Sequence, residues 1–350
     1  MADVSVADGH DADLVERLDA AASLLGDLVQ REAPLGERTT YRVGGRARLF
    51  VEASTVDDLA AVARAATTTQ LPVLVIGRGS NMLVADRGFD GIAVALGEPF
   101  TEITHDADAG TIRSGGATLL PVLARRSVAL GCTGLEWMVG VPGTVGGAVR
   151  MNAGGHGADV EDSLRAATIV DVLTGEVTER RPDELGLRFR GSSIGANEVV
   201  VDAVFAAPSG DRADGETVLS EIVRWRRENQ PGGQNAGSVF VNPGDGEVPA
   251  GLLIDESGLK GLRHRSAEVS TKHANFIQAD PGGSADDVLE LMRIVAATVE
   301  DRHGRRMRSE VRLIGFPDAD VLRRSSDPDS PDHSDLTDHS ESPDHEEPSR

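Results

Sequence analysis

The sequence predicts an α+β fold that is divided into more than one domain. Its 350 residues are 39% hydrophobic and 26% charged, an ordinary globular composition that is long enough for two or three domains. Helical periodicity and short strand-like runs both occur, and they alternate along the chain without an internal repeat. A single small module is therefore excluded.

A first lobe is expected from residue 19 to about residue 97, after a polar leader over residues 1–18. Apolar residues at steps of three and four predict an amphipathic helix, and Thr55 followed by Asp58 is typical of a helix N-terminus. The predicted elements are a helix over 12–32, a strand with a Gly-Gly turn over 40–53, a helix from Thr55 through Ala66 and a buried strand over 71–77. This order is that of a small βαβ-like unit.

A second, β-rich lobe is expected over about 98–207, and a third domain over 208–316. The predicted strands of the second lobe are TIRSGG (111–116), RAATIVDVL (165–173), EVTERR (176–181), LRFRG (187–191) and EVVVDAVFA (198–206). The third domain begins with a helix around 218–227. It continues to a helix over 284–303, which Ser284 and Asp287 cap and Gly304 ends, and it closes with a strand over 307–316.

The charge balance excludes some classes of function. The formal net charge is −22, and a chain this acidic repels a phosphate backbone, so nucleic-acid binding is not expected. The single cysteine, Cys132, cannot form an internal disulfide or a thiolate-rich metal site. The N-terminus lacks the basic and apolar regions of a secretory signal, and no apolar run approaches the roughly 20 residues that span a bilayer. We expect a cytoplasmic protein without a membrane segment.

Residues 317–350 are expected to form an acidic disordered tail. From Ser325 onward the tail has nine acidic residues, one arginine and one bulky apolar residue, Leu336, so it cannot bury enough surface to fold. Its three histidines recur at six-residue spacing beside aspartates. A solvated tail explains them better than a metal-binding tract, and no metal site is predicted.

Glycine-rich segments are the main candidates for a binding site. The chain has neither a G-x-G-x-x-G motif that opens a βαβ unit nor a P-loop motif. In VLVIGRGSNMLV a buried strand leads into Gly77–Asn81, a pattern that fits a pyrophosphate cradle and, equally well, a tight turn. The segment from Gly134 to Gly157 is rich in glycine and almost uncharged, which favours close approach of the backbone to a bulky planar or phosphorylated ligand.

Seven separated blocks, in order between about Thr39 and Gly315, carry a family resemblance: GRGSNMLV, GVPGTVGGAVRMNAGGHG, RFRGSS, NAGSVFVNP, GLLIDESGLKG, STKHANFI and SEVRLIG. Together they resemble the UDP-N-acetylenolpyruvoylglucosamine reductases, flavoenzymes of peptidoglycan synthesis. The resemblance implies an FAD-binding domain of the vanillyl-alcohol-oxidase/p-cresol-methylhydroxylase type over 19–207, made of two α+β lobes, and an α+β substrate domain over 208–316. The chain resembles the shorter form, because it lacks the long insertion that carries a tyrosine; its only tyrosine is Tyr41.

The resemblance also implies the reaction. UDP-N-acetylglucosamine enolpyruvate would take a hydride from N5 of non-covalently bound FAD, which NADPH has reduced, and would be converted to UDP-N-acetylmuramate. Three residues match the family's catalytic positions. Arg190 would hold the substrate carboxylate, Ser238 would donate the proton, and Glu310 would help to stabilise the enolate. A monomer or weak oligomer is expected.

Strand alternation adds expectations about these residues. In LRFRG it puts Arg188 and Arg190 on the face opposite Leu187 and Phe189, and in GSVFVNP it groups Ser238 with Phe240 and Asn242. Around Glu310 it puts Arg308 and Arg312 on the same face, which is equally typical of a surface ion-pair ladder. The residues expected to bind FAD are Tyr41, Gly77, Gly79, Ser80, Asn81, Gly143, Thr144, Gly146, Gly147, Asn152, Gly154 and Gly157, and those expected to contact the substrate are Asn242, Arg226, Arg227, Lys272 and His273.

Some alternatives remain open at this stage. Arg226 and Arg227 also fit an ordinary surface helix. His156 could be a covalent flavin attachment, although a loop histidine explains it better. The rival functions are a sugar or alcohol oxidase of the same fold, which rapid reaction of reduced flavin with oxygen would reveal, and a nucleotide-sugar binding protein without catalysis.

Overall fold

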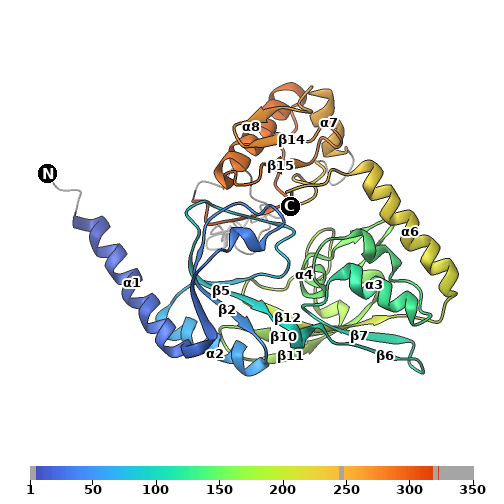
Figure 1. Ribbon diagram of the computed structural model, residues 1–350, viewed down its shortest axis with the longest axis horizontal. Coiled ribbons are helices and arrows are strands. Elements are labelled where there is room, and N and C mark those ends of the chain that lie inside the picture. Colours follow the sequence, from blue (N-terminus) through green and yellow to red (C-terminus); the bar gives the residue numbers. More distant parts are fainter. Residues whose placement is uncertain (1–4, 244–247, 318–321, 323–350) are drawn as a thin grey trace, which may run out of the picture.

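The computed structural model describes residues 5–243, 248–317 and 322, and the predicted tail therefore lies almost entirely outside the described residues. Figure 1 shows two sheet-containing lobes below a C-terminal domain. Helix α6 (Arg212–Asn229) runs along the outside of the second lobe up to the C-terminal domain. Within the described part of the chain, no helix is long and apolar enough to cross a membrane.

The first lobe is a four-stranded sheet in the order β1-β2-β5-β3, in which β2 runs parallel to β5 and β5 to β3. Helix α2 (Val56–Thr69) begins with the predicted capping box between Thr55 and Asp58, and its apolar face packs on this sheet. The strands are β1 (Val29–Ala33), β2 (Ala47–Ala53), β3 (Val73–Val75) and β5 (Phe89–Leu96).

The predicted helix over 12–32 is wrong at both ends. Helix α1 spans Ser5–Leu25, and Gly26 at φ +57° ends it. The next residues form a 3-10 turn, and Val29 then begins β1, which pairs antiparallel with β2. The helical spacing of apolar residues continues to Val29 because Val29, although it lies on β1, packs against the same core as the apolar face of α1. The predicted strand over 40–53 is likewise confined to Ala47–Ala53.

The second lobe is an antiparallel five-stranded sheet in the order β11-β10-β12-β7-β6. The helices α3 (Leu120–Ala129) and α4 (Val145–Met151) and the 3-10 helix η4 (Glu136–Gly140) share one apolar core with this sheet. Ile222 of α6 joins the same core, so α6 packs on the second lobe. The strands are β6 (Ile103–Asp106), β7 (Thr111–Gly115), β10 (Leu164–Asp171), β11 (Val177–Arg180) and β12 (Glu198–Ala206).

The C-terminal domain packs two helices against a small sheet. Helix α8 (Ala285–His303) buries the predicted face, including Val288, Leu291 and Val295, and Gly304 ends it in the left-handed conformation. Helix α7 (Ala250–Glu256) and the sheet β13-β14-β15 complete this core. The strands are β13 (Arg263–His264), β14 (Ala267–Val269) and β15 (Ile277–Ala279).

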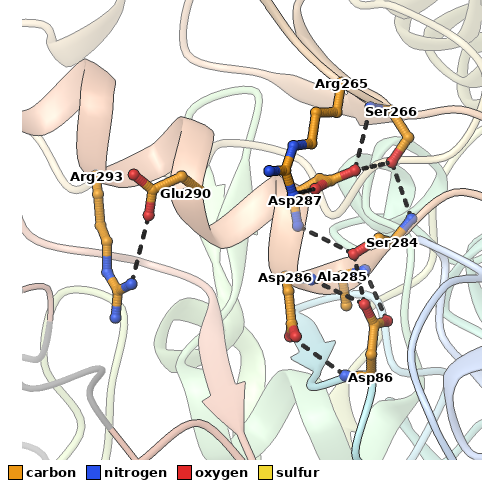
Figure 2. Close-up of polar contacts among 9 residues, drawn as sticks. All are labelled: Asp86, Arg265, Ser266, Ser284, Ala285, Asp286, Asp287, Glu290 and Arg293. Carbon is orange, nitrogen blue, oxygen red and sulfur yellow. Dashed lines mark hydrogen bonds and ion pairs between the residues drawn. The ribbon is translucent and has the colours of Figure 1, made fainter.

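Two contacts tie the first lobe to the C-terminal part of the chain. Strand β16 (Arg312–Ile314) pairs in parallel with β4 (Met82–Val84), which directly follows the first glycine-rich loop. Just beyond β4, the Asp86 carboxylate accepts hydrogen bonds from Ser284 Oγ and from the backbone N–H of Ala285, at 2.9 Å for the latter, at the start of α8 (Figure 2). A carboxylate is favourable at a helix N-terminus, so this clamp stabilises the junction.

Candidate active site

A cavity of about 720 Å³ opens between the two lobes and the C-terminal domain. Both glycine-rich segments line it, together with α6 and the segments around Arg190, Ser238 and Glu310. Its size and its mixed lining of glycine backbone and a few charged groups are those of a site for a small organic ligand or cofactor.

The first glycine-rich loop joins β3 to β4 and forms one wall of the cavity. A Cβ atom at Gly79, where φ is +62°, would lie 2.7 Å from Thr39 Cα, and one at Gly77 would lie 2.5 Å from Thr144 Oγ1. Only glycine fits at these two positions. In this loop the backbone N–H groups of Arg78 and Gly79 donate no hydrogen bond to another backbone group of the described residues. Unpaired consecutive donors of this kind suit a phosphate group.

The second glycine-rich segment lies against the first. Ser80 Oγ donates to Pro142 O at 2.9 Å, and Thr144 caps α4 by accepting from Gly147 N–H at 3.3 Å. A Cβ at Gly146 would lie 2.9 Å from Val200 O, so glycine lets α4 approach β12 closely. Of the residues expected to bind FAD, the structure places Gly77, Gly79, Ser80, Asn81, Gly143, Thr144, Gly146, Gly147 and Gly154 on the cavity wall.

The other three residues expected to bind FAD do not line this cavity. Tyr41 is fully buried in the core of the C-terminal domain, and burial raises its pKa. Asn152 is also buried; its Oδ1 accepts from Glu161 N–H and its Nδ2 donates to Arg188 O, so its amide fixes a turn. Gly157 is exposed at φ +86° and ends a loop outside the cavity wall.

Arg190, Ser238 and Glu310 all face the cavity, although they come from three distant parts of the chain. Arg190 Nε lies 3.4 Å from Glu310 Oε1, and both side chains are largely buried, at 26% and 20% exposure. Glu310 N–H donates to Val239 O at 2.7 Å, which aligns the segment after Ser238 with the segment before β16. A hydroxyl, a carboxylate and a guanidinium therefore converge on one wall.

The strand alternation predicted around Arg190 and Ser238 is wrong, whereas around Glu310 buried and half-buried residues alternate from Met307 to Arg312, as predicted. Residues 187–191 form no strand; Arg190 adopts φ +56°, and its Nη2 donates to Gly154 O at 3.2 Å. Val239 and Phe240 are both buried in the C-terminal core, so Phe240 does not share a face with Ser238. In both places, local turns and tertiary packing set the side-chain directions and the period of two fails.

Asn81, one of the expected FAD contacts, also joins two parts of this wall. Its Nδ2 donates to Glu310 O, and Arg312 N–H donates to Asn81 O, both at 3.0 Å, so Asn81 links the first glycine-rich loop to the segment that leads from Glu310 into β16. Arg150 and Arg312 also line the cavity. Arg150 could have been suspected, because it is an isolated charge in an otherwise almost uncharged segment.

Of the expected substrate contacts, Arg226 alone lines this cavity among the described residues. Lys272 Nζ donates to the carbonyl of Arg227, and the exposed Arg227 lies off the cavity wall. Asn242 Oδ1 accepts from Ala250 N–H at 2.9 Å, so it caps α7. The His273 ring packs edge-on against Phe276, with ring centroids 4.8 Å apart. Asn242 and His273 therefore each have a partner within the C-terminal domain.

The described part of the chain holds no cluster of three or more His, Cys, Asp or Glu side chains that could hold a metal ion. Cys132 is buried 3.3 Å from His105 Nε2, and burial raises its thiol pKa, which disfavours the reactive thiolate.

The fold and the cavity define an FAD-binding oxidoreductase. Residues 47–180 match the model of an FAD binding domain, and residues 229–314 match that of the UDP-N-acetylenolpyruvoylglucosamine reductase C-terminal domain. The glycine loop, where a Cβ at Gly77 or Gly79 would come within 3.0 Å of Thr144 or Thr39, and its N–H groups without backbone partners fit the phosphate part of FAD. The predicted α+β class is therefore confirmed.

The chain belongs to the UDP-N-acetylenolpyruvoylglucosamine reductase family. It is 39% identical to the reductase of Heliobacterium modesticaldum over 83% of this chain and 91% of that protein. It is 40% identical to reductase 2 of Symbiobacterium thermophilum, over 82% and 92%. Among solved structures, it resembles the UDP-N-acetylenolpyruvylglucosamine reductase of Thermus caldophilus, with a TM-score of 0.71, 33% identity and coverage of 82% and 98%.

Proposed function

We propose that this enzyme uses NADPH to reduce UDP-N-acetylglucosamine enolpyruvate to UDP-N-acetylmuramate. The observation that carries the proposal is the convergence of Arg190, Ser238 and Glu310 on the cavity whose other walls are the two glycine-rich segments. Reducing an enolpyruvyl ether requires a hydride carrier, a cation for the carboxylate and a proton donor. FAD, held by the two glycine-rich segments, would supply the hydride carrier between NADPH and the substrate.

Arg190 is the proposed cation for the substrate carboxylate. Hydride addition to the terminal carbon of the enolpyruvyl group leaves negative charge that is delocalised into this carboxylate. A guanidinium can bind it through two parallel hydrogen bonds. The contacts of Arg190 with Glu310 Oε1 and Gly154 O hold its side chain at the cavity wall before the substrate binds, so it needs little reorganisation.

Ser238 is the proposed proton donor to the carbon next to the carboxylate. Its segment is fixed on both sides, because Val239 N–H donates to Asn275 O at 2.9 Å and Glu310 N–H donates to Val239 O. Glu310, in contact with Arg190, stays ionised in this scheme. Its role is therefore to orient Arg190 and the serine hydroxyl rather than to donate a proton.

Arg226 is the proposed contact for the substrate diphosphate, and Lys272 and Arg227 could add to it only if they changed conformation. Burial lowers the pKa of the Arg226 guanidinium, and Arg226 Nε donates to Gln230 Oε1 at 2.7 Å. A partly buried cation held by a neutral amide is a suitable anion site.

The proposed kinetic scheme rests on both co-substrates using the 720 Å³ cavity. The nicotinamide and the enolpyruvyl group both have to reach the flavin from the open side of this cavity, so they would bind in turn and the kinetics would be ping-pong.

We also propose an FAD-binding domain over 19–207 and a substrate domain over 208–316, and a cytoplasmic monomer or weak oligomer, since NADPH and nucleotide sugars are cytoplasmic.

Ser238→Ala tests the proton donor. We expect reduction of the enzyme-bound flavin by NADPH to proceed at the normal rate. Its reoxidation by the enolpyruvyl substrate should slow by about 100-fold or more, the usual size of a lost general acid. Stopped-flow absorbance under anaerobic conditions measures both half-reactions.

Ser220→Ala is the matched control, because Ser220 is exposed on α6 and its hydroxyl bonds only to the Glu216 carbonyl of the same helix. Unchanged reoxidation in Ser238→Ala would remove Ser238 from the mechanism.

A further inference from the structure

One part of the cavity wall carries two aromatic rings that have no role in the chemistry proposed above, next to Arg226, the proposed diphosphate contact. It is formed by the exposed indole of Trp225 and the imidazole of His156, beside the guanidinium of Arg226. The two rings meet edge to face, with centroids 5.1 Å apart and planes at 87°. In such a pair the edge of one ring packs against the face of the other, and this contact restricts the orientation of the Trp225 indole.

The local structure holds this pair in place. His156 adopts φ +56°, a strained conformation for a residue with a side chain. Its ring lies against Gly140 of η4, where a Cβ atom would come within 2.8 Å of both the imidazole and Ile222 Cγ2. Ile222 is buried in the second lobe one helical turn before Trp225 and Arg226, so α6 presents both residues from a fixed base.

Charge and exposure at this wall indicate the kind of ligand. Trp225 is 46% exposed although it borders a cavity, so its indole has free surface. No carboxylate in the described part of the chain forms an ion pair with Arg226, which bonds to Gln230. Burial and the neighbouring Arg226 lower the pKa of His156, which keeps the imidazole neutral. A free aromatic face next to an uncompensated guanidinium suits a heteroaromatic ring that carries a phosphate.

We propose that Trp225, His156 and Arg226 form a nucleotide subsite, in which the base of a nucleotide stacks on the indole and its phosphate binds the guanidinium. The inference rests on the proposed function, which requires two nucleotide ligands in this cavity. Uridine diphosphate of the substrate and the nicotinamide nucleotide of NADPH share this chemistry.

Tryptophan fluorescence of the FAD-loaded enzyme gives a direct test. The chain has two tryptophans, so Trp137→Phe leaves Trp225 as the only one. This variant is titrated separately with uridine monophosphate and with nicotinamide mononucleotide. We expect saturable quenching by one of them, and at least a tenfold weaker response when Arg226→Gln is added. Quenching by the uridine nucleotide assigns the subsite to the substrate, and quenching by the nicotinamide nucleotide assigns it to NADPH.

Steady-state kinetics provides a second readout. Trp225→Ala should raise KM for the matching co-substrate about tenfold while kcat stays within about twofold, and Trp225→Phe should restore KM, because stacking needs only an aromatic face. Val223→Ala, at an exposed position of the same helix, is the matched control.

Two results would overturn the subsite. One is the absence of quenching by either nucleotide at millimolar concentration, and the other is an unchanged KM for both co-substrates in Trp225→Ala. Failure of the proposed function looks different. In that case the wild-type reduced flavin is not reoxidised by the enolpyruvyl substrate, whatever the fluorescence shows.

Discussion

At the scale of single residues, Arg190 shows how far the chemistry depends on unusual backbone geometry. Its position at φ +56° directs the guanidinium to both Gly154 O and Glu310, which a regular strand would not do. The neighbouring Phe189 is 65% exposed, and the Arg190 guanidinium lies 4.9 Å from its ring centroid. The local strain is compensated by contacts to two different parts of the chain.

Arg190→Lys should separate charge from geometry. Lysine keeps the positive charge but has a single ammonium, so it loses the paired hydrogen bonds to a carboxylate. We expect reoxidation of the reduced flavin by substrate to slow by about 100-fold, the loss typical of one transition-state donor, with little change in reduction by NADPH. Rapid-mixing absorbance measures both rates.

Arg188→Lys is the matched control, since Arg188 is exposed two residues away and does not line the large cavity. Equal slowing of both half-reactions in Arg190→Lys would contradict the assigned role and would indicate damage to the flavin site.

At the scale of elements, the start of α8 carries a polar network with a measurable pH dependence. Asp287 accepts hydrogen bonds from Ser266 Oγ at 2.7 Å and Ser266 N–H at 3.3 Å, and it forms an ion pair with Arg265 at 3.4 Å (Figure 2). The Ser266 hydroxyl is the main cause that lowers the pKa of Asp287 below its ordinary value. The native state therefore favours the ionised carboxylate.

Asp287→Asn tests this network through stability. The folded pKa lies below the unfolded one, so the carboxylate stabilises the fold above about pH 4, and this contribution is lost as the pH falls through the lowered folded value. We expect the variant to lose about 1–3 kcal/mol of unfolding free energy at pH 7, and the difference to shrink below pH 4. Urea unfolding at several pH values measures it.

The control for this prediction is Glu290→Gln on the same helix. Glu290 pairs with Arg293 at 3.5 Å on the surface (Figure 2), and such pairs contribute at most about 1 kcal/mol. A difference for Asp287→Asn that stays constant down to pH 3 would show that ionisation of Asp287 is not what stabilises the helix start.

The helices and strands differ in how well the sequence predicts them. Strand β12 was predicted with its observed bounds, 198–206, and α8 with its cap and its buried face, because long periodic runs between clear end signals leave few alternatives. The segments around Arg190 and Ser238 were not predictable as strands, since their conformations depend on Gly154 and Asn275 far away in sequence. The expectation that Arg190 and Ser238 lie in one site with Glu310 came from the family resemblance and not from local sequence patterns.

At the scale of the whole molecule, the site depends on contacts between distant parts of the chain. The parallel pairing of β4 with β16 and the Asn81 amide join the first glycine-rich loop to β16 and to Glu310 just before it. No local pattern in the sequence indicates this pairing, because the two strands are about 230 residues apart. The loop expected to hold the cofactor and the expected catalytic glutamate therefore form one continuous structure.

The net charge of −22 affects how an anionic substrate can be bound. A field of that sign opposes a substrate with a diphosphate and a carboxylate, so binding has to rely on local cations. The cations that line the cavity wall are Arg38, Arg78, Arg150, Arg190, Arg226 and Arg312. Lys272, one of only two lysines in the chain, donates to Arg227 O outside this wall, which leaves the cavity an arginine site.

The most direct test of the proposed reaction is a redox titration of the purified FAD-loaded enzyme without oxygen. The account predicts a yellow protein whose flavin absorbance near 450 nm is bleached by one equivalent of NADPH. One equivalent of UDP-N-acetylglucosamine enolpyruvate should then restore it fully. If the reduced flavin stayed bleached with this substrate and recovered only when oxygen was admitted, the reductase account would be contradicted in favour of an oxidase.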